Sequence, residues 1–203
     1  MAVPERLVLA SRSPQRRAIL EQLGIEFTVA TPAVEEETRG EPRRIVVENA
    51  LRKARAVAPA SVPDEGVSNE ERVLGVDTEV VLDGRVFGKA GDEADAEMML
   101  RRLSGRTHEV WSGIALVAPG GDERTGSALT RVRFRRLEEP EIAWYLDSGE
   151  WRDRAGAYAI QGRGAALVES IEGDFWNVVG LPVAELLRLA PDLARMRRAQ
   201  PSS

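Results

Sequence analysis

Short apolar runs and longer stretches with helical spacing alternate along the chain, and together they predict its elements. Buried strands are expected where apolar residues follow one another closely, first at 7–10 and most extensively at 73–82. Helices are expected where apolar residues recur every three or four positions, because this spacing puts them on one side. Five residues suited to begin or cap these helices are Pro14, Pro42, Asp92, Pro140 and Pro182.

Two of the predicted helices are defined by their apolar residues. The helix that begins at Pro42 should reach about Ala58. The helix after Asp92 should bury Met98, Leu100 and Leu103 on one side. Both are amphipathic, so each should cover part of a sheet or another helix.

The first predicted strand leads into its helix through a turn of small polar residues. Ser13 is suited to cap the helix, because its hydroxyl can accept a hydrogen bond from a free backbone N–H. Arg12, Arg16 and Arg17 surround this junction. Hydroxyls, backbone N–H groups and guanidinium groups at one point suit a phosphate, but an ordinary capped helix with solvated arginines fits this segment equally well.

The longest predicted strand contains Asp77 in its middle. Burying a carboxylate is costly unless it is paired or bound to metal, so Asp77 is the strongest candidate for a functional residue. The next residues, Asp83-Gly84, predict a two-residue hairpin. Lys89 follows that hairpin closely.

An acidic run and a lysine each allow two interpretations. Glu35, Glu36 and Glu37 form either a solvated loop or part of a divalent-metal site, because hard cations prefer several carboxylate oxygens. Lys53 lies on the helix after Pro42, where its ordinary role would be solubility. Both alternatives remain open at this point.

The glycine-rich stretch at 149–164 also contains Trp151, Tyr158 and Gln161, a mixture that is unusual for a simple connection and suggests a binding loop. His108 precedes a predicted strand, where a single histidine is usually a structural hydrogen-bonding residue.

The length of 203 residues predicts a single domain over 1–203, with an ordered core at about 4–194. The Pro-, Ser- and acid-rich stretch 59–72 is expected to be a mobile loop, and the tail 195–203 is expected to fray.

Composition excludes several classes of protein. The net charge of −5 argues against a general nucleic-acid binder. The absence of cysteine excludes a disulfide or a thiolate nucleophile, and a single histidine excludes a multi-histidine metal site. No apolar run is long enough to span a membrane, so a cytoplasmic protein is expected.

Five motifs in order resemble the Maf family of nucleoside triphosphate pyrophosphatases, over nearly the whole chain. They are ASRSPQR at 10–16, GVDT at 75–78, LSGRTHEV at 103–110, AGAYAIQG at 155–162 and GDFWNVVGLP at 173–182. The resemblance implies an α/β fold, with an elongated mixed β-sheet flanked by helices and two lobes around a cleft. It also implies hydrolysis of a nucleoside triphosphate to the monophosphate and pyrophosphate, with Mg²⁺ or Mn²⁺, by a homodimer.

The same resemblance implies a set of site residues. The catalytic positions are Asp77, Lys89, Lys53 and Glu36, of which Asp77 matches the proton acceptor. The substrate and phosphate positions are Ser11, Arg16, Thr78 and Gln161. Glu36 and Asp77 would hold the metal, although a carboxylate could equally polarise water. Four positions differ from the usual family residue: Gln15, Ala90, Arg154 and Ala159.

The resemblance further implies which base is read. The branch that acts on dTTP and UTP carries a threonine and a glutamine that match Thr78 and Gln161. An amide offers a donor and an acceptor together, which suits the edge of uracil or thymine, or a modified uridine. Alternatively, Gln161 only braces its loop. The competing functions are a 7-methyl-GTP pyrophosphatase, a pyrophosphatase for deaminated purine nucleotides, and a septum-formation regulator that binds without turnover.

Overall fold

The computed structural model describes residues 6–58 and 71–195 of the chain. The predicted mobile loop therefore lies outside the described residues over 59–70, as does the predicted tail over 196–203. Glu71 and Arg72 correct the loop prediction, because they pair with Arg6 and Leu7 and so begin a strand.

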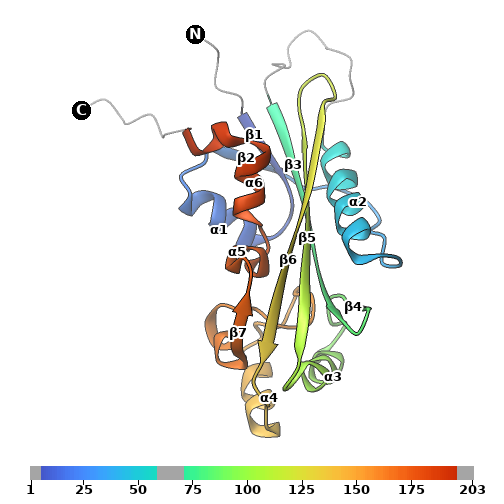
Figure 1. The fold of residues 1–203 in the computed structure, drawn as a ribbon, viewed down its shortest axis with the longest axis vertical. Helices are drawn as coiled ribbons and strands as arrows, with labels where there is room; N and C mark the ends of the chain where they lie inside the picture. Colours follow the sequence, from blue (N-terminus) through green and yellow to red (C-terminus); the bar gives the residue numbers. More distant parts are fainter. Residues whose placement is uncertain (1–5, 59–70, 196–203) are drawn as a thin grey trace, which may run out of the picture.

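Seven strands form one mixed sheet within the described residues. They are β1 (Arg6–Ala10), β2 (Phe27–Ala30), β3 (Glu71–Leu82), β4 (Arg85–Phe87), β5 (Thr107–Val117), β6 (Glu123–Phe134) and β7 (Val168–Glu172). The order is β2-β1-β3-β5-β6-β7, and β4 pairs with β3. β1 is parallel to β2 and β3, whereas the other pairs are antiparallel. The sheet is elongated because β5 and β6 run through most of its length (Figure 1).

Helices flank this sheet, as the family resemblance implies. They are α1 (Pro14–Gln22), α2 (Pro42–Arg55), α3 (Glu93–Leu103), α4 (Glu139–Leu146), α5 (Phe175–Val179) and α6 (Val183–Leu189), with short 3₁₀ helices at Gly162–Leu167 and Pro191–Arg195. In Figure 1, α1, α2, α5 and α6 surround one end of the sheet, and α3 and α4 lie at the other. None of the helices in the described residues is long and apolar enough to cross a membrane.

Two helix predictions are corrected. α2 ends at Arg55 rather than near Ala58. In α3, Met98 is 45% exposed while Met99 is buried, because the core side follows the spacing of Ala96, Met99, Leu100 and Leu103.

The core forms separate clusters along the sheet. One face carries a cluster at each end, joined by β3 and β5: Leu74 and Ile114 belong to one, and Val80 and Val110 to the other. A third, smaller cluster lies on the opposite face beneath α2 and includes Ala50 and Ala54.

Two glycines allow α2 to lie directly on the sheet. A Cβ at Gly75 of β3 would lie 2.0 Å from the carbonyl oxygen of Ala50, and a Cβ at Gly113 of β5 would lie 2.1 Å from that of Val46. No larger residue fits without moving the helix. This close approach brings the buried side of α2 onto the middle of β3.

One edge of β3 is open between its partner strands. Along β3, the pairing with β1 ends at Gly75, opposite Ala10, and the pairing with β4 starts at Val80, opposite Phe87. Among the described residues, no strand pairs with this edge over 76–79. Backbone groups of β3 are thus available to side chains there.

Candidate active site

The turn between β1 and α1 folds around two serines. Ser13 caps α1, and its hydroxyl accepts a hydrogen bond from the backbone N–H of Arg16 at 3.5 Å. The hydroxyl of Ser11, which is buried, accepts from the backbone N–H of Ser13 at 3.2 Å. Gln15 accepts a hydrogen bond from the Ser13 hydroxyl, so this departure from the family pattern supports the cap.

Arg16 fills the open edge of β3. Its Nη1 donates to the backbone oxygen of Val76 at 2.8 Å and to the hydroxyl of Ser11 at 3.0 Å. Its Nε donates to the backbone oxygen of Gly180 and its Nη2 to the hydroxyl of Thr78. Four of the five guanidinium N–H groups are therefore used within the protein, and one on Nη2 remains.

The charge of Arg16 is buried and opposed by nearby carboxylates. Burial lowers the pKa of the Arg16 guanidinium, while the negative charges of Asp77 and Glu36 raise it. These interactions place the serine turn within electrostatic reach of Asp77. Thr78 joins the same network, since its hydroxyl lies 2.8 Å from the hydroxyl of Ser112 on β5.

Asp77 lies on the opposite side of β3, facing α2. Its Oδ1 accepts a hydrogen bond from Nζ of Lys53 at 2.6 Å. The same ammonium lies 2.7 Å from Oε1 of Glu36, which comes from the loop between β2 and α2. Asp77 and Lys53 are buried, whereas the side chain of Glu36 is 44% exposed. The structure thus brings together these three predicted residues around one ammonium group.

Asn49 holds this cluster in place, although sequence reasoning did not single it out. Its Nδ2 donates to Oδ2 of Asp77 at 3.0 Å and to the backbone oxygen of Glu37 at 2.9 Å. Its Oδ1 accepts from the backbone N–H of Glu37 at 2.7 Å. The amide therefore fixes the acidic loop against α2. The signal available in the sequence was that Asn49 lies one helical turn before Lys53, on the same side of α2.

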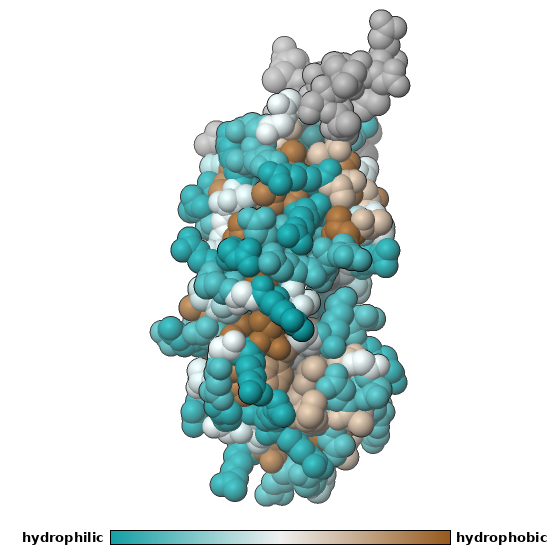
Figure 2. Space-filling view, turned by 90° about the vertical axis from the view of Figure 1, so that its right-hand side faces the viewer, coloured by the Kyte–Doolittle hydropathy of each residue, from teal (hydrophilic) through white to brown (hydrophobic). Residues whose placement is uncertain are grey.

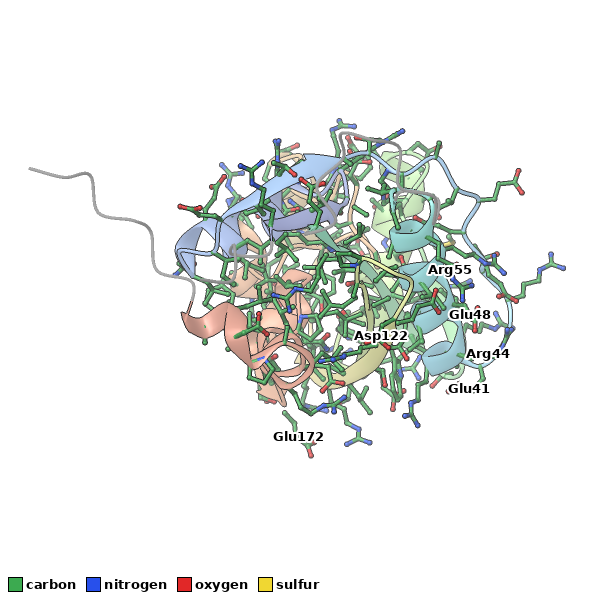
Figure 3. All side chains as sticks on the ribbon, turned by 90° about the horizontal axis from the view of Figure 1, so that it is seen from above. Glu41, Arg44, Glu48, Arg55, Asp122 and Glu172 are labelled. Atoms are coloured by element: carbon green, nitrogen blue, oxygen red, sulfur yellow. The ribbon has the colours of Figure 1, made fainter. Side chains whose placement is uncertain are left out.

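The rest of the acidic run is solvated, as one of the two interpretations predicts. Glu37 pairs with Arg44 and Arg52 on the outer side of α2, and the Arg44 contact lowers the pKa of Glu37. Figure 3 shows Glu41, Arg44, Glu48 and Arg55 along this side of the helix. The space-filling view is mostly hydrophilic over this end of the molecule (Figure 2).

Glu79 is a buried acid that the sequence analysis missed. It is 7% exposed, and its Oε2 has no hydrogen-bond partner among the described residues. Burial raises the pKa of Glu79 to about 8, and the charges of Asp77 and Glu36 add to this effect. The signal was present in the sequence, because Asp77 and Glu79 are two positions apart and so face the same side of a strand.

The two remaining predicted site residues, Lys89 and Gln161, are exposed. The positive charges of Lys53 and Lys89 lower the pKa of Glu79, so Lys89 lies within electrostatic reach of the cluster. Lys89 also pairs with Ala155 through an isolated backbone bridge. Gln161 stands at the start of the 3₁₀ helix without a side-chain hydrogen bond to it. The structure does not join Gln161 to the Asp77 cluster.

The aromatic residues of the predicted binding loop belong to the core. Trp151 is buried and donates through Nε1 to the backbone oxygen of Leu146. Tyr158 is buried and its hydroxyl lies 2.8 Å from Nε2 of His108. The structural role predicted for His108 is confirmed, while the prediction of a binding loop now depends on Gln161 alone.

The site offers oxygen donors of the kind that Mg²⁺ and Mn²⁺ prefer. Glu36 and Asp77 share the Lys53 ammonium, and the unpartnered Oε2 of Glu79 lies on the same side of β3. Within 6–58 and 71–195, however, no group of three or more acidic or histidine side chains is already gathered to hold a metal. A cation here would need oxygen atoms from water or from a ligand as well.

A serine- and arginine-lined turn beside a buried cluster of opposite charges is typical of α/β proteins that handle phosphorylated ligands. The chain belongs to the Maf family, whose sequence pattern, described as Maf-like protein, matches residues 6–193.

Curated relatives support this membership over most of the chain. The dTTP/UTP pyrophosphatase of Symbiobacterium thermophilum is 50% identical over 187 residues, which cover 91% of this chain and 92% of the relative. That of Dictyoglomus thermophilum is 44% identical over 186 residues, covering 90% and 93%. A solved HAM1 protein from Coxiella burnetii aligns over 80% of this chain and 91% of its own, at 20% identity and a TM-score of 0.45.

Proposed function

We propose that this chain hydrolyses nucleoside triphosphates to the monophosphate and pyrophosphate, with a preference for dTTP, UTP or a modified uridine triphosphate. The observation that carries this proposal is the buried cluster of Asp77, Lys53 and Glu36 at the open edge of β3. It adjoins the turn that carries Ser11 and the start of α1, which carries Arg16. The names of the curated relatives support the same activity and the same bases.

The positive groups of the site bind the phosphates. Ser11 lies in the turn, and Arg16 retains one Nη2 N–H beside it for a phosphate oxygen. Lys53 has one N–H beyond the two that contact Asp77 and Glu36, and Lys89 is exposed to incoming substrate. Anhydride hydrolysis depends mainly on such positioning and charge neutralisation.

Asp77 accepts the proton of the attacking water. Water attacks the α-phosphorus, the bond to the bridging oxygen breaks, and pyrophosphate leaves. Lys53 and Asn49 each donate to one oxygen of Asp77, which fixes the plane of its carboxylate. Each oxygen keeps a lone pair for a proton or a cation.

Glu36 and Asp77 would hold a divalent cation, Mg²⁺ or Mn²⁺. When bound, such a cation neutralises negative charge on the phosphate oxygens. The loop that carries Glu36 is fixed to α2 by Asn49, so this carboxylate stays near Asp77.

Thr78 and Gln161 contribute to the choice of base in different ways. The Thr78 hydroxyl is already bonded to Arg16 and Ser112, so Thr78 acts by holding Arg16. The Gln161 side chain is exposed and makes no cap bond, so it is free to pair with a base. A site that pairs with one base edge penalises bases lacking the complement.

A pyrophosphate-release assay on a panel of nucleotides tests the proposal. With Mg²⁺ or Mn²⁺, we expect dTTP and UTP to be cleaved faster than CTP, GTP, ATP and 7-methyl-GTP, with monophosphate as the second product. EDTA should abolish the activity without unfolding the protein. A preference for 7-methyl-GTP would contradict the choice of base, and no release from any nucleotide would favour a binding protein without turnover.

Gln161→Ala is expected to reduce the ratio of UTP to GTP cleavage by roughly tenfold, because one pair of polar contacts to the base is lost. Arg163→Ala is a matched control, since Arg163 is also exposed at this 3₁₀ helix and contacts the Trp144 ring. The measurement is kcat/KM for both nucleotides. An unchanged ratio in Gln161→Ala would show that Gln161 only braces its loop.

We also propose a cytoplasmic homodimer, on the family resemblance. Sedimentation should then give twice the 22.3 kDa mass of one chain.

A further inference from the structure

Glu79 lies beside the proposed catalytic cluster of Asp77, Lys53 and Glu36 but takes part in none of the contacts within it. It occupies β3 two positions after Asp77, so both carboxylates face the side covered by α2. Its cross-strand partner on this face is Trp111 of β5. The side chain is 7% exposed, and no donor within the described residues reaches its Oε2.

Nearby positive groups do not compensate this carboxylate directly. The ammonium of Lys53 is engaged by Asp77 and Glu36 at 2.6 and 2.7 Å. Lys89 affects Glu79 only through its charge, and its own side chain is exposed. A buried carboxyl group without a partner is costly to ionise unless a cation or donor reaches it.

The position of Glu79 suits a divalent cation that water surrounds in the free protein and that the phosphates of the substrate contact in the complex. Mg²⁺ and Mn²⁺ are commonly bound by one or two carboxylates, with phosphate oxygens and water completing the shell. Asp77 and Glu79 form such a pair on one side of β3. Because the described residues gather no three-residue metal group, water or phosphate oxygens would have to complete the shell of this cation.

We propose that Glu79 acts with Asp77 as a ligand of the divalent cation that accompanies the triphosphate. This inference rests on the proposed function and adds to it a residue outside the set implied by the family resemblance. In the metal-bound protein, Glu79 joins Glu36 and Asp77 as a ligand, and its unpartnered Oε2 faces the cation.

Mn²⁺ binding to the nucleotide-free protein tests this assignment separately from catalysis. The EPR signal of free Mn²⁺ would be titrated with the wild type, with Glu79→Gln, which removes the negative charge at constant shape, and with Glu109→Gln. Glu109 is a matched control, because it lies on the same face of the sheet but already contacts Trp111 and Arg131. We expect Glu79→Gln to weaken Mn²⁺ binding roughly tenfold or more, and Glu109→Gln to leave it unchanged.

A luminescence measurement places the cation. Tb³⁺ also prefers oxygen ligands and emits when a nearby indole is excited. Side chains of directly paired strand residues lie roughly 5 Å apart at Cβ, so Trp111 should sensitise a Tb³⁺ ion bound by Glu79. The emission should be lost in Trp111→Phe, which keeps the carboxylates, and strongly reduced in Glu79→Gln.

The outcomes separate this inference from the proposed function. Equal Mn²⁺ affinity of the wild type and Glu79→Gln, including no uptake by either, would overturn the assignment even if Glu79→Gln had lost activity. If the wild type cleaves dTTP but Glu79→Gln binds Mn²⁺ and Tb³⁺ as the wild type does, only this inference fails. If Mn²⁺ binding depends on Glu79 but no nucleotide releases pyrophosphate, the metal site stands and the proposed function fails.

Discussion

The carboxylate of Asp77 is 4% exposed, and both of its oxygens accept hydrogen bonds from α2. Each partner has a different effect on the site. Lys53 supplies a charge that compensates the buried carboxylate, while Asn49 sets its orientation. Because a buried ion pair is expensive to assemble, its presence in the middle of a β-prone strand favours a functional explanation over a stabilising one.

Asp77→Asn is expected to retain the fold and to lower kcat by roughly two orders of magnitude or more, the scale of a lost general base or metal carboxylate. The amide keeps the shape of the side chain but has no negative charge to accept a proton. The measurements are kcat for dTTP and the far-UV CD spectrum. Asp83→Asn is the control, because Asp83 lies in the exposed hairpin turn and asparagine tolerates its φ of 51°. Near-normal activity of Asp77→Asn would remove Asp77 from the mechanism.

His108 provides a residue-scale prediction about pH. Burial lowers the pKa of His108 to about 4, and the ring contacts Tyr158 and Phe134, neither of which is charged at neutral pH. The folded state therefore keeps His108 neutral, while the unfolded state takes up a proton near pH 6.5. The stability from this residue is complete above pH 6.5 and decreases by about 3 kcal/mol as the pH falls towards 4.

Denaturant unfolding at pH 7 and pH 5 measures this loss. His108→Gln, which does not titrate, should show a smaller decrease in unfolding free energy between the two pH values. Because the chain has a single histidine, NMR of the imidazole also reports its pKa directly. A value near 6.5 would show that the ring is not buried as described.

The sequence was sufficient for some residues of the site and not for others. Asp77 is recognisable because a charge interrupts an apolar strand. Asn49 is not, because its partners, Asp77 and the backbone of Glu37, are brought to it only by the fold. Glu79 was missed because an acid two positions after Asp77 also fits a strand with one solvated face. Trp151 was misjudged because an aromatic residue in a loop can pack in the core as well as bind a ligand.

At the scale of the elements, the site depends on how closely α2 approaches the sheet. Gly113 pairs with Asp77 across β3 and β5, and Val46 of α2 lies directly above it. A helix in this position places Asn49 and Lys53 on Asp77. The two glycines that α2 packs against, Gly75 and Gly113, therefore set how close Asn49 and Lys53 lie to Asp77.

Gly113→Ala is expected to destabilise the protein by about 1–3 kcal/mol and to lower activity, because an added Cβ would lie 2.1 Å from a backbone oxygen and push α2 outward. Gly91→Ala is the control, since a Cβ there meets nothing within 4 Å. The measurements are the free energy of unfolding and kcat. If both variants matched the wild type, the close packing of α2 would not hold.

Element boundaries followed from the sequence where a local signal marks them. Proline and cap residues predicted the starts of α1, α2 and α3, and Asp83-Gly84 predicted the β3–β4 hairpin. The start of β3 was misplaced because Glu71 and Arg72 become strand residues through pairing with β1, a long-range contact. The exposure of Met98 likewise depends on which side of α3 meets the core.

At the scale of the whole molecule, the two ends share their longest strands. Val110 and Ile114 lie on β5, yet the first belongs to the core cluster at one end and the second to the cluster at the other. If one cluster unfolded, the strands that also carry the other cluster would lose part of their pairing and packing. The active-site cluster lies on the same strands, so the two ends should remain fixed relative to each other.

We therefore expect the molecule to unfold in one cooperative transition. Trp151 is buried in the core at one end, and Trp176 packs against the core at the other. Two variants, each keeping one of these tryptophans with the other three replaced by phenylalanine, would be unfolded in guanidinium and followed by fluorescence and by far-UV CD. Within each variant, both signals should give the same midpoint, because the shared strands couple the clusters. If fluorescence of Trp151 and CD gave separate midpoints, the two ends would unfold independently, and the continuous sheet would not couple them.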